Sequence, residues 1–353
     1  MGTTDDLHSR TTLPLIVAPM FLVSTPEMAI EACRQGVVGS FPALNQRTSA
    51  GLEAWLIQMN DTLDALRKAD PAAVIAPYAV NLIVNPVANP RLQADLDLCI
   101  KYKVPIIITS LGAVPALVQQ VHAYGGIVLH DVTNIDHAKK AAAAGVDGLI
   151  AVSAGAGGHG GTMNPIALVN EIRQFFDGLL VLAGGLTTGK DILAAQAIGA
   201  DFAYMGTRFI NTVESSADPA HKQMISDAAS KDIVYTAAIT GVPANFLRQS
   251  LEKEGFDVEE LKKQQTVDPA KLKSAEGEKK AWKKIWAAGQ GVGNISGIPT
   301  VAQLITELKQ QYAKAQPELL KKIGQNPLAC PPPSLPDLGP APGAQPPLSP
   351  PPP

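Results

Sequence analysis

The sequence predicts an α/β fold: a (β/α)8 barrel with a smaller, mostly helical C-terminal appendage and a disordered proline-rich tail. Short apolar runs alternate with amphipathic stretches of helical period along the first two-thirds of the chain. The runs are almost continuously hydrophobic, which is typical of parallel strands buried on both faces. Eight such units with right-handed crossovers can close into a barrel. The alternative is an open, doubly wound sheet.

The strands and helices follow one another in a regular order. The eight apolar runs that predict strands are Leu15–Met20, Val37–Pro42, Tyr78–Val84, Val104–Ser110, Ile127–Val132, Gly148–Ser153, Leu179–Gly185 and Asp201–Phe209. The helices predicted between them are Thr25–Gln35, Gly51–Ala69, Arg91–Lys103, Pro115–Tyr124, Ile135–Ala144, Pro165–Phe176 and Lys190–Ile198. Several of these helices are followed by a glycine, as expected at a helix C-terminus. These glycines are Gly36, Gly125, Gly145 and Gly199.

The composition changes after Phe209, where the chain becomes more polar and richer in Lys and Glu. We therefore predict three segments. Residues 1–215 form the barrel core, and residues 216–315 form the last barrel helix and a helical appendage near the barrel mouth, interrupted by a loop at 241–250. Residues 316–353 form a flexible tail, because a stretch dominated by proline cannot bury a core.

Bulk properties exclude several function classes. Hydrophobic residues make up 46% of the 353 residues, and the formal net charge is only −3 without a basic stripe. Neither nucleic acid nor a membrane surface is therefore expected as a partner. The sequence has no signal peptide and no apolar run of spanning length, so a cytoplasmic location is expected. The three cysteines lack metal-ligand spacing, no metal site is predicted, and an oligomer is compatible with the sequence.

Two glycine turns predict a phosphate site. Gly184 and Gly185 end the seventh predicted strand, and Met205, Gly206 and Thr207 end the eighth. Glycine allows backbone N–H groups to approach a ligand closely, and barrel enzymes bind phosphate beside their last two strands. The sequence lacks the Rossmann glycine spacing, so a mononucleotide is favoured over a dinucleotide.

The loop after the sixth predicted strand carries the best catalytic candidate. Five glycines lie between Gly155 and Gly161, and they surround His159. Histidine titrates near neutrality, so it can take a proton from a weakly acidic carbon or hydrogen-bond an anionic substrate. His130, at the end of the fifth strand, is the second candidate, and Ser110 at the end of the fourth is a further substrate-side candidate. No GxSxG or HExxH motif is present, which argues against simple hydrolases and zinc enzymes.

These motifs together resemble those of the nitronate monooxygenases, which are FMN-containing TIM barrels. The resemblance covers about residues 13–315. Its motifs are PLIVAPM (14–20), YAVNL (78–82), AGGHGG (156–161), LAGGL (182–186) and YMGTRF (204–209), with a weaker match in WAAGQGV (286–292).

The resemblance implies an FMN-dependent enzyme that oxidises alkyl nitronates, and also nitroalkanes, with molecular oxygen and without NAD(P)H. It implies that Ala18, Pro19 and Met20 line the flavin ring and that Asn81 hydrogen-bonds the ring. His159 corresponds to the catalytic histidine of the family. The ribityl chain and phosphate are assigned to Gly157, Gly158, Gly184, Gly185, Met205, Gly206 and Thr207.

One position departs from the pattern of the family. Many relatives place Lys or Gln near the flavin after the fifth strand, whereas this chain has Asp131. An acidic group beside the ring disfavours an anionic reduced flavin, so either Asp131 points away or Ser110 or Thr133 supplies the donor. Two alternatives therefore stay open: an NAD(P)H-dependent FMN reductase of the same superfamily, such as an enoyl-acyl-carrier-protein or quinone reductase, and a non-catalytic flavin-binding scaffold.

Overall fold

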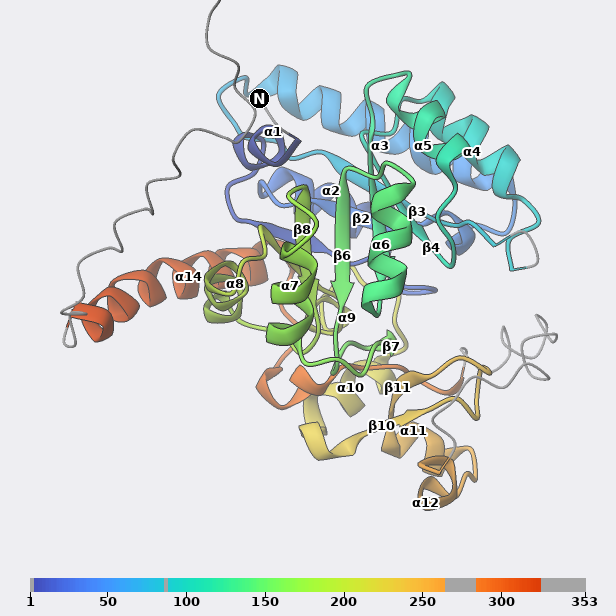
Figure 1. Ribbon diagram of the computed structural model, residues 1–353, viewed down its shortest axis with the longest axis vertical. Coiled ribbons are helices and arrows are strands. Elements are labelled where there is room, and N and C mark those ends of the chain that lie inside the picture. Colours follow the sequence, from blue (N-terminus) through green and yellow to red (C-terminus); the bar gives the residue numbers. More distant parts are fainter. Residues whose placement is uncertain (1–2, 86–87, 264–283, 325–353) are drawn as a thin grey trace, which may run out of the picture. The chain divides into compact units, whose positions relative to one another are not determined.

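Eight parallel strands are hydrogen-bonded into one sheet, around which the helices lie (Figure 1). The computed structural model describes residues 3–85, 88–263 and 284–324, so the proline-rich part of the predicted tail lies outside the described residues. The strand order is β1-β9-β8-β6-β5-β4-β3-β2, and a parallel bridge between Ile16 and Val38 joins the two ends of this order. The predicted barrel is thus confirmed. Its strands are β1 (Leu15–Val17), β2 (Gly39–Pro42), β3 (Tyr78–Ile83), β4 (Ile106–Ser110), β5 (Ile127–Val132), β6 (Gly148–Val152), β8 (Leu179–Ala183) and β9 (Phe202–Met205).

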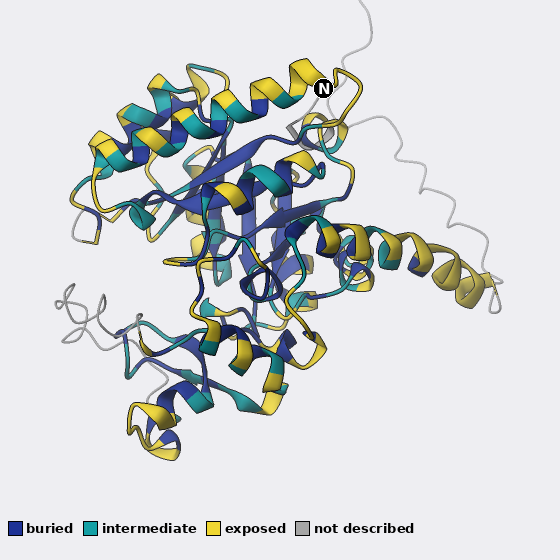
Figure 2. Cartoon of the chain, turned by 180° about the vertical axis from the view of Figure 1, so that it is seen from behind, coloured by how far each residue is buried: buried dark blue, intermediate teal, exposed yellow. Residues whose placement is uncertain are grey.

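A layer of helices surrounds the barrel, and their starts follow from local sequence. The side chains of Thr25, Thr48, Asn134 and Thr188 each accept a hydrogen bond from a backbone N–H in the first helical turn that follows. These helices bury one face against the strands and expose the other (Figure 2). They are α2 (Pro26–Arg34), α3 (Ser49–Ala69), α4 (Leu92–Lys101), α5 (Pro115–His122), α6 (Ile135–Ala143), α7 (Pro165–Arg173) and α8 (Gly189–Ala197).

The outer helix that follows the last strand is supplied late in the chain, by α14 (Val301–Gly324). Leu304, Ile305 and Leu308 of this helix pack in one core cluster with Met28 of α2 and Ile192 of α8. Helix α14 therefore occupies the position between α8 and α2 in the outer layer. Among the described residues, no helix is both long enough and apolar enough to cross a membrane.

Alternate residues of each strand face two different cores. On β5, for example, Leu129 belongs to the cluster inside the barrel, whereas Val128 and Val132 belong to the cluster between strands and helices. Leu7 of the short helix α1 (Thr3–Ser9) belongs to the interior cluster. The period of two along each strand thus decides which side chains are available inside the barrel.

The segment between β9 and α14 contains more than helices. It includes α9 (Thr207–Ile210), α10 (Pro219–Asp227), α11 (Arg248–Lys253) and α12 (Val258–Leu261), and also β10 (Ile233–Thr236) and β11 (Ala244–Leu247). Strands β10 and β11 form an antiparallel sheet with β7 (Gly158–His159). The loop predicted at 241–250 is wrong from Ala244 onward, where β11 and the start of α11 lie. Gly241 and Pro243 mark only the turn that precedes the strand.

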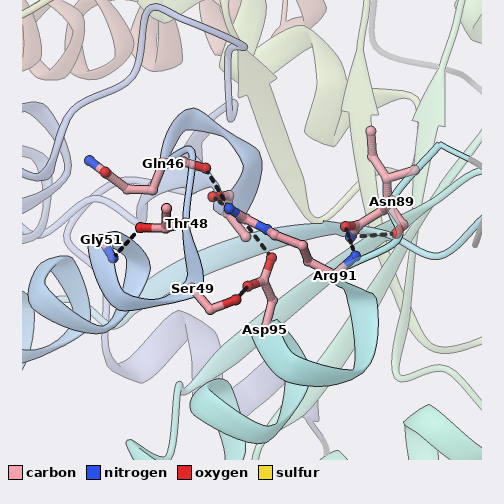
Figure 3. Close-up of polar contacts among 9 residues, drawn as sticks. Gln46, Thr48, Ser49, Gly51, Asn89, Arg91 and Asp95 are labelled. Atoms are coloured by element: carbon pink, nitrogen blue, oxygen red, sulfur yellow. Dashed lines mark hydrogen bonds and ion pairs between the residues drawn. The ribbon is translucent and has the colours of Figure 1, made fainter. Parts of the chain in front are cut away.

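A buried ion pair ties together the loops that follow β2 and β3 (Figure 3). Arg91 donates to the Asp95 carboxylate at 2.9 Å and to the Gln46 carbonyl at 3.0 Å. Ser49 donates to the other Asp95 oxygen at 2.8 Å. Asp95 is fully buried and the Arg91 side chain is 22% exposed. Because the two loops lie at the carboxyl ends of barrel strands, this network fixes part of the face where barrels bind ligands.

We expect Asp95→Asn to lower the free energy of unfolding by about 3 kcal/mol, because it leaves the Arg91 guanidinium without its charged partner. The partial exposure of Arg91 places the value at the low end of the range for broken buried pairs. Urea denaturation followed by circular dichroism measures this loss. Asp97→Asn is the matched control, since Asp97 lies exposed on the same helix and should change stability by less than about 0.5 kcal/mol. Equal effects of the two substitutions would contradict the role of the ion pair.

Candidate functional site

Four glycine-containing segments, far apart in the sequence, meet at the carboxyl ends of β6, β8 and β9. The Gly289 N–H donates to Thr207 Oγ1 at 2.8 Å, and the Gln290 N–H donates to the Gly155 carbonyl at 2.8 Å. A β-carbon added at Gly291 would lie 2.7 Å from the Gly185 carbonyl oxygen. The loop after β6, the turns after β8 and β9, and the segment around Gly289 therefore form one site.

Among the described residues, the predicted phosphate turns carry backbone amides without hydrogen-bond partners. Gly184 and Gly185 have φ values of 132° and 71°, which favour glycine. A β-carbon at Gly185 would meet no atom within 4 Å, and the residue is exposed. In the described part of the chain, no hydrogen-bond partner is found for the backbone N–H of Gly184, Gly185, Gly206 or Thr207. The N–H groups at the start of α8, in contrast, are taken up by Asp191 and Gln311.

Not every predicted glycine has a ligand-facing role in this geometry. A β-carbon at Gly184 would lie 2.2 Å from Ser153 Oγ, and one at Gly157 would lie 2.8 Å from the Gly289 nitrogen. Close packing against neighbouring side-chain and backbone atoms therefore explains both of these glycines without a ligand. Gly158 lies in β7 with a φ of 69°, and an added β-carbon would meet nothing within 4 Å, so its backbone conformation favours glycine.

The residues after β1 lie beside the turn after β9. The Ala18 N–H donates to the Met205 carbonyl at 2.9 Å, and an added β-carbon at Gly206 would lie 3.5 Å from Ala18 Cβ and 3.6 Å from Met20 Sδ. Pro19 is half-buried between them in the sequence. The Met205 side chain is buried in the outer core, so Met205 contributes its backbone to this site.

Several polar side chains face the barrel interior near the same ends of the strands. Asn81 donates to the Ile108 carbonyl and to Ser110 Oγ, both at 3.3 Å. Asp131 alternates with Leu129 of the interior cluster, and Tyr204 belongs to that cluster. Asp131 therefore does not point away from the barrel, and burial raises its pKa to about 7.

His159 is held by the small antiparallel sheet. In the register of β7 with β11, His159 lies opposite Ala244 and Gly158 opposite Asn245. Thr240 Oγ1 lies 3.5 Å from His159 Nε2. The side chain is exposed to solvent, yet the surrounding protein desolvates it and lowers its pKa from 6.5 towards about 4. At neutral pH the imidazole is uncharged and able to accept a proton.

The structure places His130 apart from this group. Its Nδ1 lies 2.7 Å from Thr109 Oγ1, on the outer side of the strands, and its side chain is buried. Burial, and then the nearby His137, lower its pKa to about 4. Strand alternation explains the position, because the neighbouring Leu129 faces inward. Thr133 likewise contacts His137, at 3.5 Å, on the helix side.

Three residues that the sequence analysis did not select fix the backbone of the histidine loop. Asn245 Nδ2 donates to the Ala156 carbonyl at 2.7 Å, and Tyr235 Oη donates to the Gly160 carbonyl at 3.2 Å. Thr240 contacts the histidine itself. The three contacts join residues that are 75, 81 and 89 positions apart, so only the isolated polar positions within an apolar stretch such as Ala244–Leu247 could have pointed to them.

Comparisons with known proteins show which family this chain belongs to. The chain is 29% identical over 339 residues to a nitronate monooxygenase of Paraburkholderia phytofirmans. This match covers 84% of this chain and 92% of the relative. It is 34% identical over 164 residues to a Mycobacterium tuberculosis protein named provisionally as a monooxygenase, and this match spans 46% of this chain and only 44% of that protein. The solved structure of FabK from Thermotoga maritima superposes with a TM-score of 0.75 at 25% identity, covering 91% of this chain and 98% of FabK. The family model for nitronate monooxygenase matches residues 6–311, and the chain therefore belongs to the nitronate monooxygenase family.

Proposed function

We propose that this protein binds FMN at the carboxyl ends of the barrel strands and oxidises alkyl nitronates with molecular oxygen, without NAD(P)H. The observation that carries the proposal is the position of His159, which strand pairing holds on a loop whose Gly157 lies against Thr207. The amides of the turns after β8 and β9 have no partner among the described residues. Membership of the family supports the oxidoreductase class. The reaction, the cofactor and the residue roles are our inference from that geometry.

The residues present fit FMN. The amides of Gly185, Gly206 and Thr207 face the same site and are suited to phosphate oxygens, since oriented backbone N–H groups bind anions. Ala18 and Met20 offer an apolar surface next to Gly206 for a flat ring. The unpartnered polar atoms of Asp131 and Tyr204 fit a ligand with hydrogen-bonding groups on its edge.

His159 acts on the substrate in two ways. Its neutral imidazole accepts the proton from the carbon beside the nitro group of a neutral nitroalkane, which creates the nitronate. For a substrate that is already a nitronate, the same ring donates an N–H hydrogen bond to an anionic oxygen. When bound, FMN supplies the electron transfer between substrate and oxygen. Asn81 and Ser110, on neighbouring strands, offer polar groups to the ring and the substrate.

The test is the visible spectrum of the purified protein, followed by anaerobic mixing with propyl-2-nitronate and, separately, with NADH. We expect a bound flavin whose absorbance changes with the nitronate and stays constant with NADH. Bleaching by NADH alone would instead support an NAD(P)H-dependent reductase of the same superfamily. A colourless protein that cannot be loaded with FMN would overturn the proposal as a whole.

A further inference from the structure

Two buried polar atoms inside the barrel have no hydrogen-bond partner in the part of the chain that the structure describes. They are Asp131 Oδ1, on β5, and Tyr204 Oη, on β9. Buried polar groups in proteins are nearly always paired, and an unsatisfied one costs about 1–3 kcal/mol. Two such atoms in the same interior, near the carboxyl ends of their strands, indicate that a bound molecule supplies the missing partners.

The two side chains lie within electrostatic reach of each other. Burial, and then the charge of Asp131, raise the pKa of Tyr204 well above its usual value of 10. Asp131 itself responds to burial alone, which raises its pKa to about 7. Burial is the only cause of this shift among the described residues, with no cation opposing it, so the carboxyl keeps its proton more readily than a surface aspartate does.

Among the described groups that face Asp131 from the surrounding strands, Tyr204 is the titratable one. Ser110 on β4 is neutral, and on β6 the residues of the interior cluster are Ile150 and Val152. His130, on the same strand as Asp131, faces outward to Thr109. His159, on the loop after β6, is uncharged well above its lowered pKa of about 4.

We propose that Asp131 and Tyr204 hydrogen-bond the polar edge of the flavin ring, that Asp131 does so as a carboxylic acid, and that FMN affinity falls when Asp131 ionises. The inference rests on the proposed function. A protonated carboxyl and a phenol can each donate to the carbonyl oxygens and ring nitrogens of a flavin. A ring seated on Asp131 also removes the water that still reaches this half-buried residue, which disfavours the carboxylate further.

The first test is the dissociation constant of FMN between pH 5.5 and 8.5, measured by quenching of flavin fluorescence on the apoprotein. Wild-type protein should lose affinity as the pH rises, approaching about tenfold per pH unit above the pKa of Asp131. Asp131→Asn, which mimics the protonated carboxyl, should lack this component. The phosphate of FMN titrates near pH 6 in both proteins, so the difference between the two slopes isolates Asp131. Tyr204→Phe should weaken binding about fivefold at every pH, by the loss of one hydrogen bond.

The outcomes separate this inference from the proposed function. Identical slopes of FMN affinity against pH in wild-type protein and Asp131→Asn would overturn the proposed role of Asp131 and Tyr204. FMN binding as such would remain intact. A wild-type protein that binds no FMN at any pH would overturn both.

A second readout uses the apoprotein alone. The folded pKa of Asp131 is raised above its ordinary value of 3.8, so the folded state holds a proton that the unfolded state releases. The contribution of Asp131 to stability should therefore fall as the pH rises from about 4 to 7, and Asp131→Asn should stabilise the apoprotein more at pH 8.5 than at pH 5.5. Thermal denaturation measures this, with Asp177→Asn, at an exposed loop position, as the matched control. A stabilisation that does not change with pH would contradict the ionisation of Asp131 in the folded protein.

Discussion

His159→Asn should lower kcat/KM for a neutral nitroalkane on the order of 10²-fold or more, while the FMN content stays unchanged. The substitution removes the group that takes the proton from carbon, and it leaves the glycine turns after β8 and β9 intact. The effect is measured by oxygen consumption with nitroethane. Asparagine retains a polar side chain at a position whose backbone is fixed by pairing with Ala244, so the loop should stay folded.

The substrate comparison makes this prediction specific to proton transfer. A nitronate has already lost the proton, so it should suffer a smaller loss in the same variant. His137→Asn, on the exposed face of α6, is the matched control and should keep wild-type activity with both substrates. Equal losses of kcat/KM with the nitroalkane and with the nitronate would contradict the assignment of His159 as the base.

The pH dependence of the same reaction follows from the lowered pKa of His159. The base must be unprotonated, so kcat/KM for the nitroalkane should be constant at neutral pH and fall as the pH drops through the pKa. Because the ring is both desolvated and reached by water, we expect this acid limb between pH 4 and 6.5. For nitronates the limb should be weak, since their binding does not require an unprotonated imidazole. An acid limb above pH 6.5 for the nitroalkane would contradict the desolvation of His159.

Gly185→Asp should give a protein that purifies without colour, with an affinity for FMN reduced on the order of 10²-fold or more. A carboxylate at this position faces the open space in front of unpartnered amides, where a phosphate would sit. Two like charges at about 4 Å repel by about 4 kcal/mol at a protein surface, before screening by salt. Flavin content after reconstitution with FMN, measured by absorbance, reports the loss.

Gly185→Asn separates charge from backbone strain. Asparagine has the same shape as aspartate and tolerates the positive φ of 71° at least as well, so both variants share the conformational cost. We expect the asparagine variant to keep FMN within about tenfold of the wild-type affinity. A yellow Gly185→Asp protein with full occupancy would refute the phosphate placement, and equal losses in both variants would assign the effect to the turn itself.

The barrel could be predicted from the sequence because the signal for each strand lies within its own residues, which are apolar on both sides of the sheet. The run Gly148–Ser153 and the glycine cap at Gly145 each reveal their structure without knowledge of any distant residue. Strand β11 could not be predicted in the same way. Its four residues are stabilised by pairing with β10 and β7, and the second of these partners lies over 80 residues earlier in the sequence.

The placement of residues in the candidate site could be predicted where backbone conformation dictates the residue type, and less so where the orientation of a side chain decides. The glycines after β8 and β9 and the histidine loop come together as expected. His130 and Asp131 are adjacent in sequence, yet strand alternation sends one outward and the other inward, and one register position decides between them. Thr240 and Asn245 act through contacts that arise only after folding, so their types alone carried no signal.

The pairing of β7 with β11 has a consequence for synthesis on the ribosome. All eight barrel strands have been made once Met205 is added, yet His159 acquires its partner strand only after Leu247, and the last outer helix begins at Val301. A nascent chain can therefore assemble strands before it can position its histidine. The histidine that we propose as the base is thus set in place only after the chain has been translated through Leu247.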